Sequence, residues 1–136
     1  MGKYSNLNSD IYSVFSTDIW KAEKIVTRPS NFVGLDKPSE FIRVSVIPSG
    51  TGLNRKSVSG VLIIDIFTQA GGGPKRSAII ADKLDSYLSG KSLSTTAGTT
   101  VQFPESSAMD LKGSDKDNPA LYRVAYTIPF NYFEVL

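Results

Sequence analysis

One run of apolar residues dominates the hydropathy pattern of this chain. It covers residues 61–67 (VLIIDIF), with Gly60 before it and three glycines at positions 71–73 after it. The run is too short for a typical helix and is rich in β-branched side chains, which favour a pleated strand. We therefore predict a central strand here, with even-numbered residues on one face and odd-numbered residues on the other.

The two faces of this predicted strand differ in polarity. Leu62, Ile64 and Ile66 make the even face wholly apolar, whereas the odd face carries Asp65 beside Phe67. We expect the even face to lie on the protein's own core. The odd face is expected to meet solvent or a neighbouring subunit.

Two further segments alternate between apolar and polar residues, which predicts half-buried strands. The first covers residues 40–47, with Arg43 on its polar side, and it is expected to end at Pro48 because proline cannot donate to a strand ladder. The second covers residues 121–130, with Arg123 on its less apolar side. It is expected to be the last strand of the sheet.

An antiparallel pairing of the first two strands predicts a specific ion pair. The register that sets Ile47 opposite Val61 also sets Arg43 opposite Asp65, because opposite residues share a face. We expect the arginine to neutralise the one charge in the apolar run.

Two segments have apolar residues at spacings of three and four, which predicts helices. One runs from residue 6 to about residue 24, and the other from about residue 75 to residue 88, between Pro74 and Gly90. The stripe of the first helix has five members: Leu7, Ile11, Val14, Phe15 and Ile19. Trp20 lies off that stripe, and such a residue is more often part of a core than a partner contact. Both helices are expected to cover the even face of the sheet.

The remaining segments are less regular. Residues 49–59 predict an extended hairpin arm, and residues 99–103 a short strand. Residues 105–119 are rich in Ser, Gly, Asp and Lys and predict a long flexible loop. Residues 131–136 predict an apolar tail.

These elements together predict one α+β domain over residues 1–136. Its order is α-β-β-α-β-β, an antiparallel or mixed sheet of about four strands with two helices packed on one face. A chain of 136 residues, 40% hydrophobic and 21% charged, is long enough for one packed core and short for two.

The composition argues against several kinds of catalytic site. The chain has no cysteine and no histidine, which removes disulfides, thiolate nucleophiles, histidine triads and the commonest zinc ligands. No catalytic residues, metal ligands or cofactor-binding residues are therefore expected. The net charge of +2 disfavours bulk attraction to nucleic acid or membrane. No secretory signal or run of roughly 20 apolar residues is visible, so a cytoplasmic protein is expected.

A glycine-rich turn supports an alternative interpretation of the chain, in which it binds a ligand. Residues 71–75 (GGGPK) follow a strand and precede a helix, where backbone N–H groups can hold phosphate. Their order differs from a P-loop, because Pro74 separates the glycines from the lysine. A connector is favoured, with a small phosphate- or ligand-binding module as the alternative. Asp110, Asp115 and Asp117 lack the spacing of a calcium-binding loop.

Four segments carry a resemblance to a known family. They are the strand EFIRVSVIPSG, the strand GVLIIDIFTQAGGG, the helix RSAIIADKLDSYL and the closing strand LYRVAYTIPF. The most characteristic parts are residues 61–88, with Ala81 and Asp82 in the helix, and the ending Ile128-Pro129-Phe130. From Phe41 onward, most of the chain resembles the tail terminator proteins of long-tailed bacteriophages.

The resemblance implies a structural protein of the virion that acts without a cofactor or a reaction. As a homo-oligomer, a hexameric ring, it is expected to cap the head-proximal end of the tail tube and stop polymerisation of the tail tube protein. It would also present a surface to the head–tail connector protein, with DNA passing through the ring without specific binding. It would assemble in the host cytoplasm and have no membrane partner. A head–tail joining protein or a minor tail protein is the alternative within the same class.

A closed ring requires a heterologous interface, in which two different patches of the subunit meet. We expect these patches on the odd face of the sheet and at the tip of the hairpin arm. The candidate interface residues are Arg43, Asp65, Phe67 and Arg123, with Leu53, Asn54, Arg55 and Lys56 in the arm.

Overall fold

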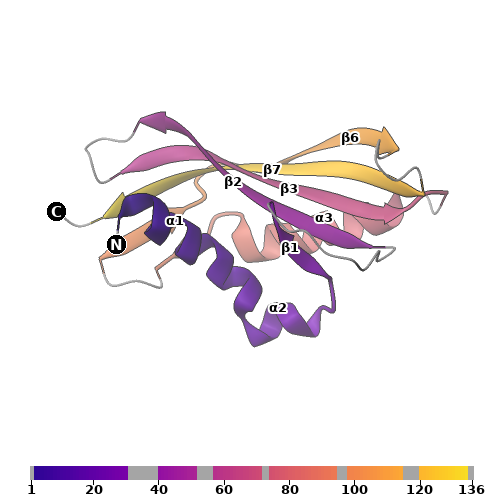
Figure 1. The fold of residues 1–136 in the computed structure, drawn as a ribbon, viewed down its shortest axis with the longest axis horizontal. Coiled ribbons are helices and arrows are strands. Elements are labelled where there is room, and N and C mark those ends of the chain that lie inside the picture. The colour runs from indigo at the N-terminus through magenta and orange to yellow at the C-terminus, as the bar shows by residue number, and fades with distance from the viewer. Residues whose placement is uncertain are drawn as a thin grey trace.

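The fold is a curled sheet with helices on one of its faces (Figure 1). The structure, a computed structural model, describes residues 2–30, 40–51, 57–71, 74–94, 98–114 and 120–134. The elements follow in the order α1 (Lys3–Tyr12), the 3-10 helix η1 (Ser13–Ser16), α2 (Asp18–Ala22), β1 (Thr27–Pro29), β2 (Phe41–Thr51), β3 (Val58–Gln69), α3 (Lys75–Leu88), β4 (Ser92–Leu93), β5 (Thr99–Gln102), β6 (Ala108–Ser114) and β7 (Leu121–Glu134).

The described residues form one seven-stranded sheet. Its strand order is β1-β2-β3-β7-β5-β4, and β6 also pairs with β7. Strands β1 and β2 are parallel and the other pairs are antiparallel, so the sheet is mixed. The predicted α+β class is confirmed. The predicted count of about four strands and the order α-β-β-α-β-β are wrong, partly because β1 and β4 are too short to show a periodicity.

The predicted central strand and its register are confirmed. Strand β3 lies between β2 and β7 and pairs with β7 along its whole length. In the β2–β3 pair, Ile47 is opposite Val61 and Arg43 is opposite Asp65. No bulge interrupts the ladder between these two pairs, so the alternation along each strand keeps its phase.

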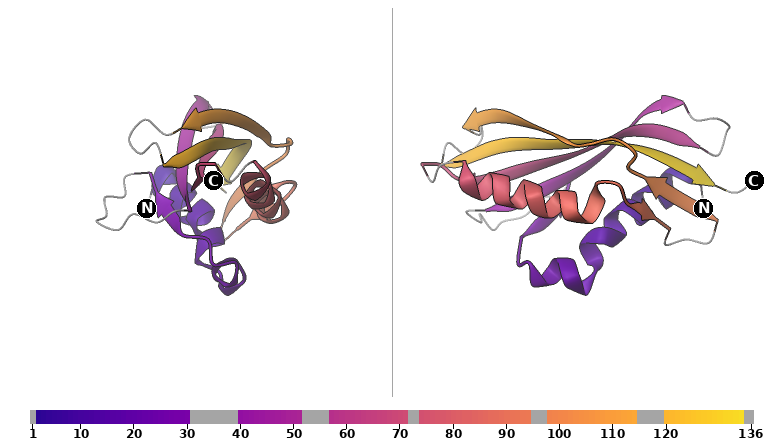
Figure 2. Two further views of the ribbon diagram at one scale, coloured as in Figure 1. Left: turned by 90° about the vertical axis from the view of Figure 1, so that its right-hand side faces the viewer. Right: turned by 180° about the vertical axis from the view of Figure 1, so that it is seen from behind.

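Helices α1 and α3 cover the even face of β3, as predicted (Figure 2). The side chains of Leu62, Ile64 and Ile66 are fully buried there. Residues from both helices join them in one core cluster: Leu7 and Ile11 from α1, and Ile80, Leu84 and Leu88 from α3. Each such side chain contributes about 1.5–3 kcal/mol by leaving water.

The single helix predicted for residues 6–24 is wrong, because the chain forms two α-helices joined by η1. Thr17 adopts an extended conformation and caps α2, its side chain accepting a hydrogen bond from the Trp20 N–H at 3.2 Å. This break shifts the helical stripe by one residue. Ile19 is therefore 71% exposed, whereas Trp20 is buried. The core interpretation of Trp20 is confirmed, and its Nε1 donates to Thr27 Oγ1 at 2.9 Å.

Strand β2 continues past Pro48, so the prediction that this proline ends the strand is wrong. The N–H of Ile42 donates to the Val26 carbonyl, on the side of β1. Backbone N–H directions alternate along a strand, so the Pro48 nitrogen points to the same edge. Strand β1 pairs only with residues 42–44. At Pro48 no described strand on that edge requires a donor, and the ladder to β3 continues with a register shift between Pro48 and Gly50.

Residues 105–119, predicted as a loop, contain strand β6, which pairs with β7. Residues 108–112 are exposed, so β6 lacks the apolar alternation that identifies a half-buried strand. Met109 and Leu111 are among the exposed residues of this strand. A register shift between Leu111 and Gly113, where Gly113 has φ +86°, further obscures the pattern.

Other element boundaries are partly confirmed. Helix α3 has the predicted bounds, with Gly90 at φ +71° just after it, and β5 lies within the predicted residues 99–103. The hairpin arm predicted for residues 49–59 is shorter, since β2 runs to Thr51 and β3 starts at Val58. The predicted tail at 131–136 is wrong for residues 131–134, which extend β7. Tyr132 there is fully buried and continues the alternation.

Candidate assembly surface

The face of the sheet turned away from the helices, here called the outer face, is built of cross-strand rows. Each row has one residue from β2, one from β3 and one from β7, set by the two antiparallel registers. From one end to the other the rows are Phe41–Phe67–Arg123, Arg43–Asp65–Ala125, Ser45–Ile63–Thr127 and Ile47–Val61–Pro129. The outer face thus changes along its length from charged and aromatic to apolar.

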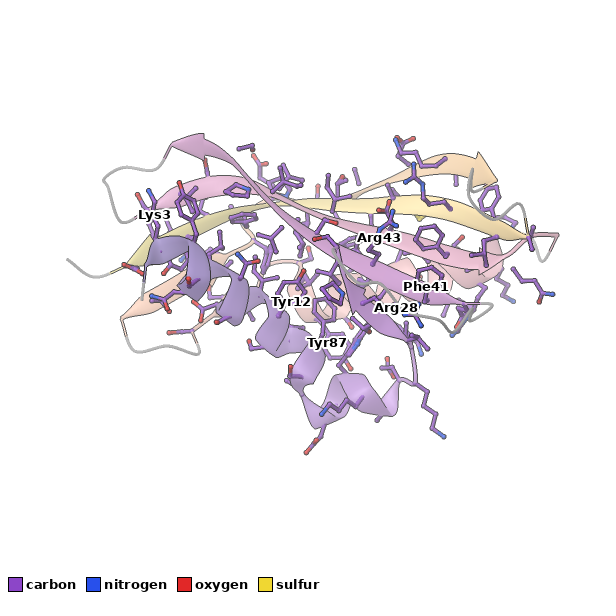
Figure 3. All side chains as sticks on the ribbon, in the orientation of Figure 1. Lys3, Tyr12, Arg28, Phe41, Arg43 and Tyr87 are labelled. Atoms are coloured by element: carbon purple, nitrogen blue, oxygen red, sulfur yellow. The ribbon has the colours of Figure 1, made fainter. Side chains whose placement is uncertain are left out.

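Arginine and phenylalanine side chains surround Asp65 at one end of this face. This arginine cluster consists of Arg28, Phe41, Arg43, Asp65, Phe67 and Arg123. Figure 3 labels Arg28, Phe41 and Arg43. Arg43 Nη2 donates to Asp65 Oδ2 at 3.2 Å, which confirms the predicted ion pair. Arg123 Nη1 lies 3.8 Å from the other carboxylate oxygen. Asp65 therefore lies between two guanidinium groups and is itself buried.

Aromatic rings contact two of the three arginines of the cluster. The rings of Phe41 and Phe67 are stacked, with centroids 4.5 Å apart and planes inclined by 15°. The guanidinium of Arg43 lies over Phe67 at 5.1 Å from its centroid, and that of Arg28 over Phe41 at 5.2 Å. Cation–π contacts of this kind attract guanidinium groups to the faces of aromatic rings. Phe67, expected to be an interface residue, is buried beneath these neighbours.

Sequence reasoning missed two members of the cluster. Phe41 is two residues before Arg43 on a strand, so the alternation already used for β2 places it on the same face. Arg28 lies opposite Arg43 only through the parallel register of β1. That strand has three residues, and no pattern in the sequence reveals its register.

An apolar strip adjoins the arginine cluster. We define it as Ile47, Val61, Ile63 and Pro129, from the last two rows of the outer face. Ile47 is 42% exposed, and the other three are half-buried. The helices lie on the opposite side of the sheet (Figure 2), where the core cluster is buried.

Half of the predicted interface residues are thus brought together. Arg43, Asp65, Phe67 and Arg123 lie in one cluster, on strands β2, β3 and β7. The other four, Leu53, Asn54, Arg55 and Lys56, lie outside the described residues.

A pocket of about 460 Å³ lies beside the glycine-rich turn. Its described lining consists of Gln69, Gly71, Pro74, Leu111 and Tyr122, none of them cationic. Residues 72–73 of the turn lie outside the described residues. The surroundings of this pocket favour an apolar group over the phosphate that the alternative interpretation requires.

A carboxylate on the helix-covered side has a structural role. Asp85 of α3 accepts hydrogen bonds from the Tyr126 hydroxyl and from Ser107 Oγ. Burial raises the pKa of Tyr126, and the bond to Asp85 raises it further, so the phenol stays neutral and keeps donating. This network ties α3 to β7 and to the segment before β6.

Two features are absent from the described part of the chain. In that part, no group of three or more Asp, Glu, His or Cys side chains is arranged to hold a metal ion. No helix among the same residues is long and apolar enough to cross a membrane.

Comparisons with known proteins support the fold alone. No family model matches the sequence, and no curated protein matches it. One solved structure aligns with 96% of this chain and 95% of its own chain, with a TM-score of 0.70 and 12% sequence identity. At that identity the similarity shows a shared fold and carries no statement about function.

Proposed function

We propose that this protein is a tail terminator, a structural subunit that forms a hexameric ring on the head-proximal end of a phage tail tube. The sequence resemblance in residues 61–88 and 128–130 supports this proposal. The structural observation that carries it is the uncovered outer face, where the apolar strip adjoins the arginine cluster.

The outer face has the composition of a protein–protein interface. Such interfaces combine an apolar centre with a polar rim and are enriched in aromatic residues and arginine. The apolar strip supplies the apolar centre of a contact between copies, and the arginine cluster borders it. Both lie on long paired strands, so the contacting side chains are held on a rigid support.

A ring needs a second, different patch on each subunit. Strand β6 offers one, because Met109 and Leu111 are 45% and 58% exposed. In register they lie opposite Tyr126 and Val124, which belong to the helix-covered face. The two patches are therefore distinct surfaces, as a heterologous contact requires.

The ring acts by contact alone in this proposal. It occupies the end of the tube, so that no further tail tube protein adds there, and it presents its opposite side to the head–tail connector. DNA passes through its centre without specific binding. The subunit assembles in the host cytoplasm and stays in the virion.

Mass measurement and electron microscopy of the purified protein test the ring. We expect closed rings, and Ile63→Lys should abolish them without unfolding the subunit, because it places a charge in the apolar strip. Ile19→Lys is the matched control, at a 71% exposed position on α2. A protein that stays monomeric at high concentration and leaves tail tubes unchanged would contradict the proposal.

Tube length separates termination from head joining. Particles made without this protein should carry overlong tubes if it terminates them. Tubes of normal length that lack heads would assign it to joining instead.

A further inference from the structure

The two arginines that contact Asp65 carry more positive charge than its carboxylate balances. Arg43 and Arg123 share the single carboxylate of Asp65. Asp110 lies further along the second row, opposite Ala125, but Lys112 already pairs with it at 2.7 Å.

Arg43 and Arg123, which share the carboxylate of Asp65, keep N–H donors that can bind groups from solvent. A guanidinium has five N–H donors, and one from Arg43 is used in a hydrogen bond to Asp65. The side chains of Arg43 and Arg123 are 38% and 34% exposed, against 12% for Asp65. The carboxylate of Asp65 thus lies beneath the two guanidinium groups, which are the groups accessible to solvent. Stacking over Phe67 holds Arg43 in position before any ligand arrives.

We propose that the arginine cluster receives surface carboxylates of a second protein, one different from this chain. Guanidinium forks match carboxylates with two parallel hydrogen bonds, which gives geometry as well as energy. The adjoining apolar strip serves the contact between copies of this chain in the proposed ring. The inference deepens the proposed function, on which it rests, by naming the chemistry that one assembly partner presents.

Carboxylates of a different protein fit this surface better than DNA or a second copy of this chain does. A net charge of +2 gives little long-range attraction to the phosphate backbone of DNA. A second copy of this chain has the same net positive charge, with a pI of about 8.8. An acidic partner has the complementary charge.

A short acidic peptide serves as the probe. A blocked ten-residue peptide that alternates glutamate and threonine is titrated into the full ¹⁵N-labelled chain, with its glutamine counterpart as control. We expect the glutamate peptide to shift the side-chain Nε–H resonances of Arg43 and Arg123, and its affinity to fall with added salt. The glutamine peptide should leave these resonances unchanged.

Variants then test the arginines. The double variant Arg43→Gln/Arg123→Gln should bind the peptide at least about tenfold more weakly, since it loses charge-assisted hydrogen bonds. The variant Arg43→Lys/Arg123→Lys keeps the charge but loses the guanidinium forks. Its affinity for the peptide should lie between those of the wild type and the glutamine double variant. Lys21→Gln/Lys75→Gln removes the same charge from exposed helix positions and should bind as the wild type does. Thermal unfolding checks that each variant is folded.

Three results would overturn the inference. One is equal affinity for the glutamate and glutamine peptides, or a loss of affinity in Lys21→Gln/Lys75→Gln as large as that in Arg43→Gln/Arg123→Gln. Another is tighter, arginine-dependent binding of a duplex DNA, which would assign the surface to nucleic acid. The third is a shift of the same arginine resonances with protein concentration alone, which would assign it to a second copy. Rings that form while the peptide fails to bind would remove this inference and leave the proposed function intact. Peptide binding without rings would do the reverse.

Discussion

The two faces of strand β3 are stabilised by different forces, although they alternate residue by residue. Ile64 is fully buried under the helices, whereas its neighbour Ile63 is half-buried on the outer face without a helix above it. The covered face is held by apolar packing. The outer face is held by stacked rings and ion pairs around Asp65. One strand therefore supplies the fold with one set of side chains and a contact surface with the other.

The largest expected effect comes from the covered face. Ile64→Ala should lower the free energy of unfolding by about 4 kcal/mol, because it leaves a cavity in a packed core. Ile63→Ala is the matched change one residue away and should cost about 1 kcal/mol, since water can fill the space. Urea unfolding measures both. Equal losses would show that the two faces do not differ as described.

Gly60 tests how tightly the covered side is packed. A Cβ at this position would lie 2.1 Å from the Ile47 carbonyl oxygen and 2.9 Å from the Phe130 ring. Gly60→Ala should therefore cost about 3 kcal/mol, through displaced backbone. Gly2→Ala is the control, at φ −83° with nothing within 4 Å of the new atom, and should cost no more than about 1 kcal/mol, because Gly2 is the N-cap of α1. A small loss for Gly60→Ala would mean that β2 shifts there easily.

The features that the sequence predicts well are those with a local pattern. Helix α3 has one stripe and clear ends, so its bounds follow from the residues. The register of β2 against β3 follows because Arg43 and Asp65 are charges of opposite sign that share a face with apolar residues around them. Four of the six members of the arginine cluster could therefore be predicted from the sequence.

The features that it predicts poorly depend on contacts between distant segments. The break at Thr17 is one example, since the apolar spacing continues to Ile19 although the chain has left the helix. Strand β6 is another: its pairing with β7 comes from backbone hydrogen bonds, which residue types do not record. Arg28 joins the cluster through a three-residue parallel strand.

A smaller effect is expected from the outer face. Asp65→Ala leaves the arginines without their shared carboxylate, and should lower stability by about 1.5 kcal/mol at low salt. Added salt should reduce the loss, because it screens the repulsion among the arginines. Asp110→Ala on the same face removes an exposed ion pair and should cost less than about 0.5 kcal/mol. Similar losses for the two variants would mean that the cluster does not depend on its central carboxylate.

The smallest effect is expected from an ion pair on the helix-covered side. Arg76 of α3 donates hydrogen bonds to both carboxylate oxygens of Glu40, at 2.6 and 2.9 Å, and thereby lowers the pKa of Glu40 from its usual 4.5. The side chains of Arg76 and Glu40 are 41% and 29% exposed, so solvent screening limits the contribution of the pair to less than about 1 kcal/mol. Glu40→Gln should cause a loss of that size at neutral pH.

The pH dependence of this pair has a definite sign. Because the pKa of Glu40 is lower in the folded state, the stabilisation is present above the usual value of 4.5 and disappears as the pH falls through the folded-state pKa. The stabilities of wild type and Glu40→Gln should therefore converge in acid, as urea unfolding over a pH series would measure. A difference that persists in acid would mean that Glu40 acts through packing. The ion pair would then add nothing to the packing that already holds α3 on the sheet.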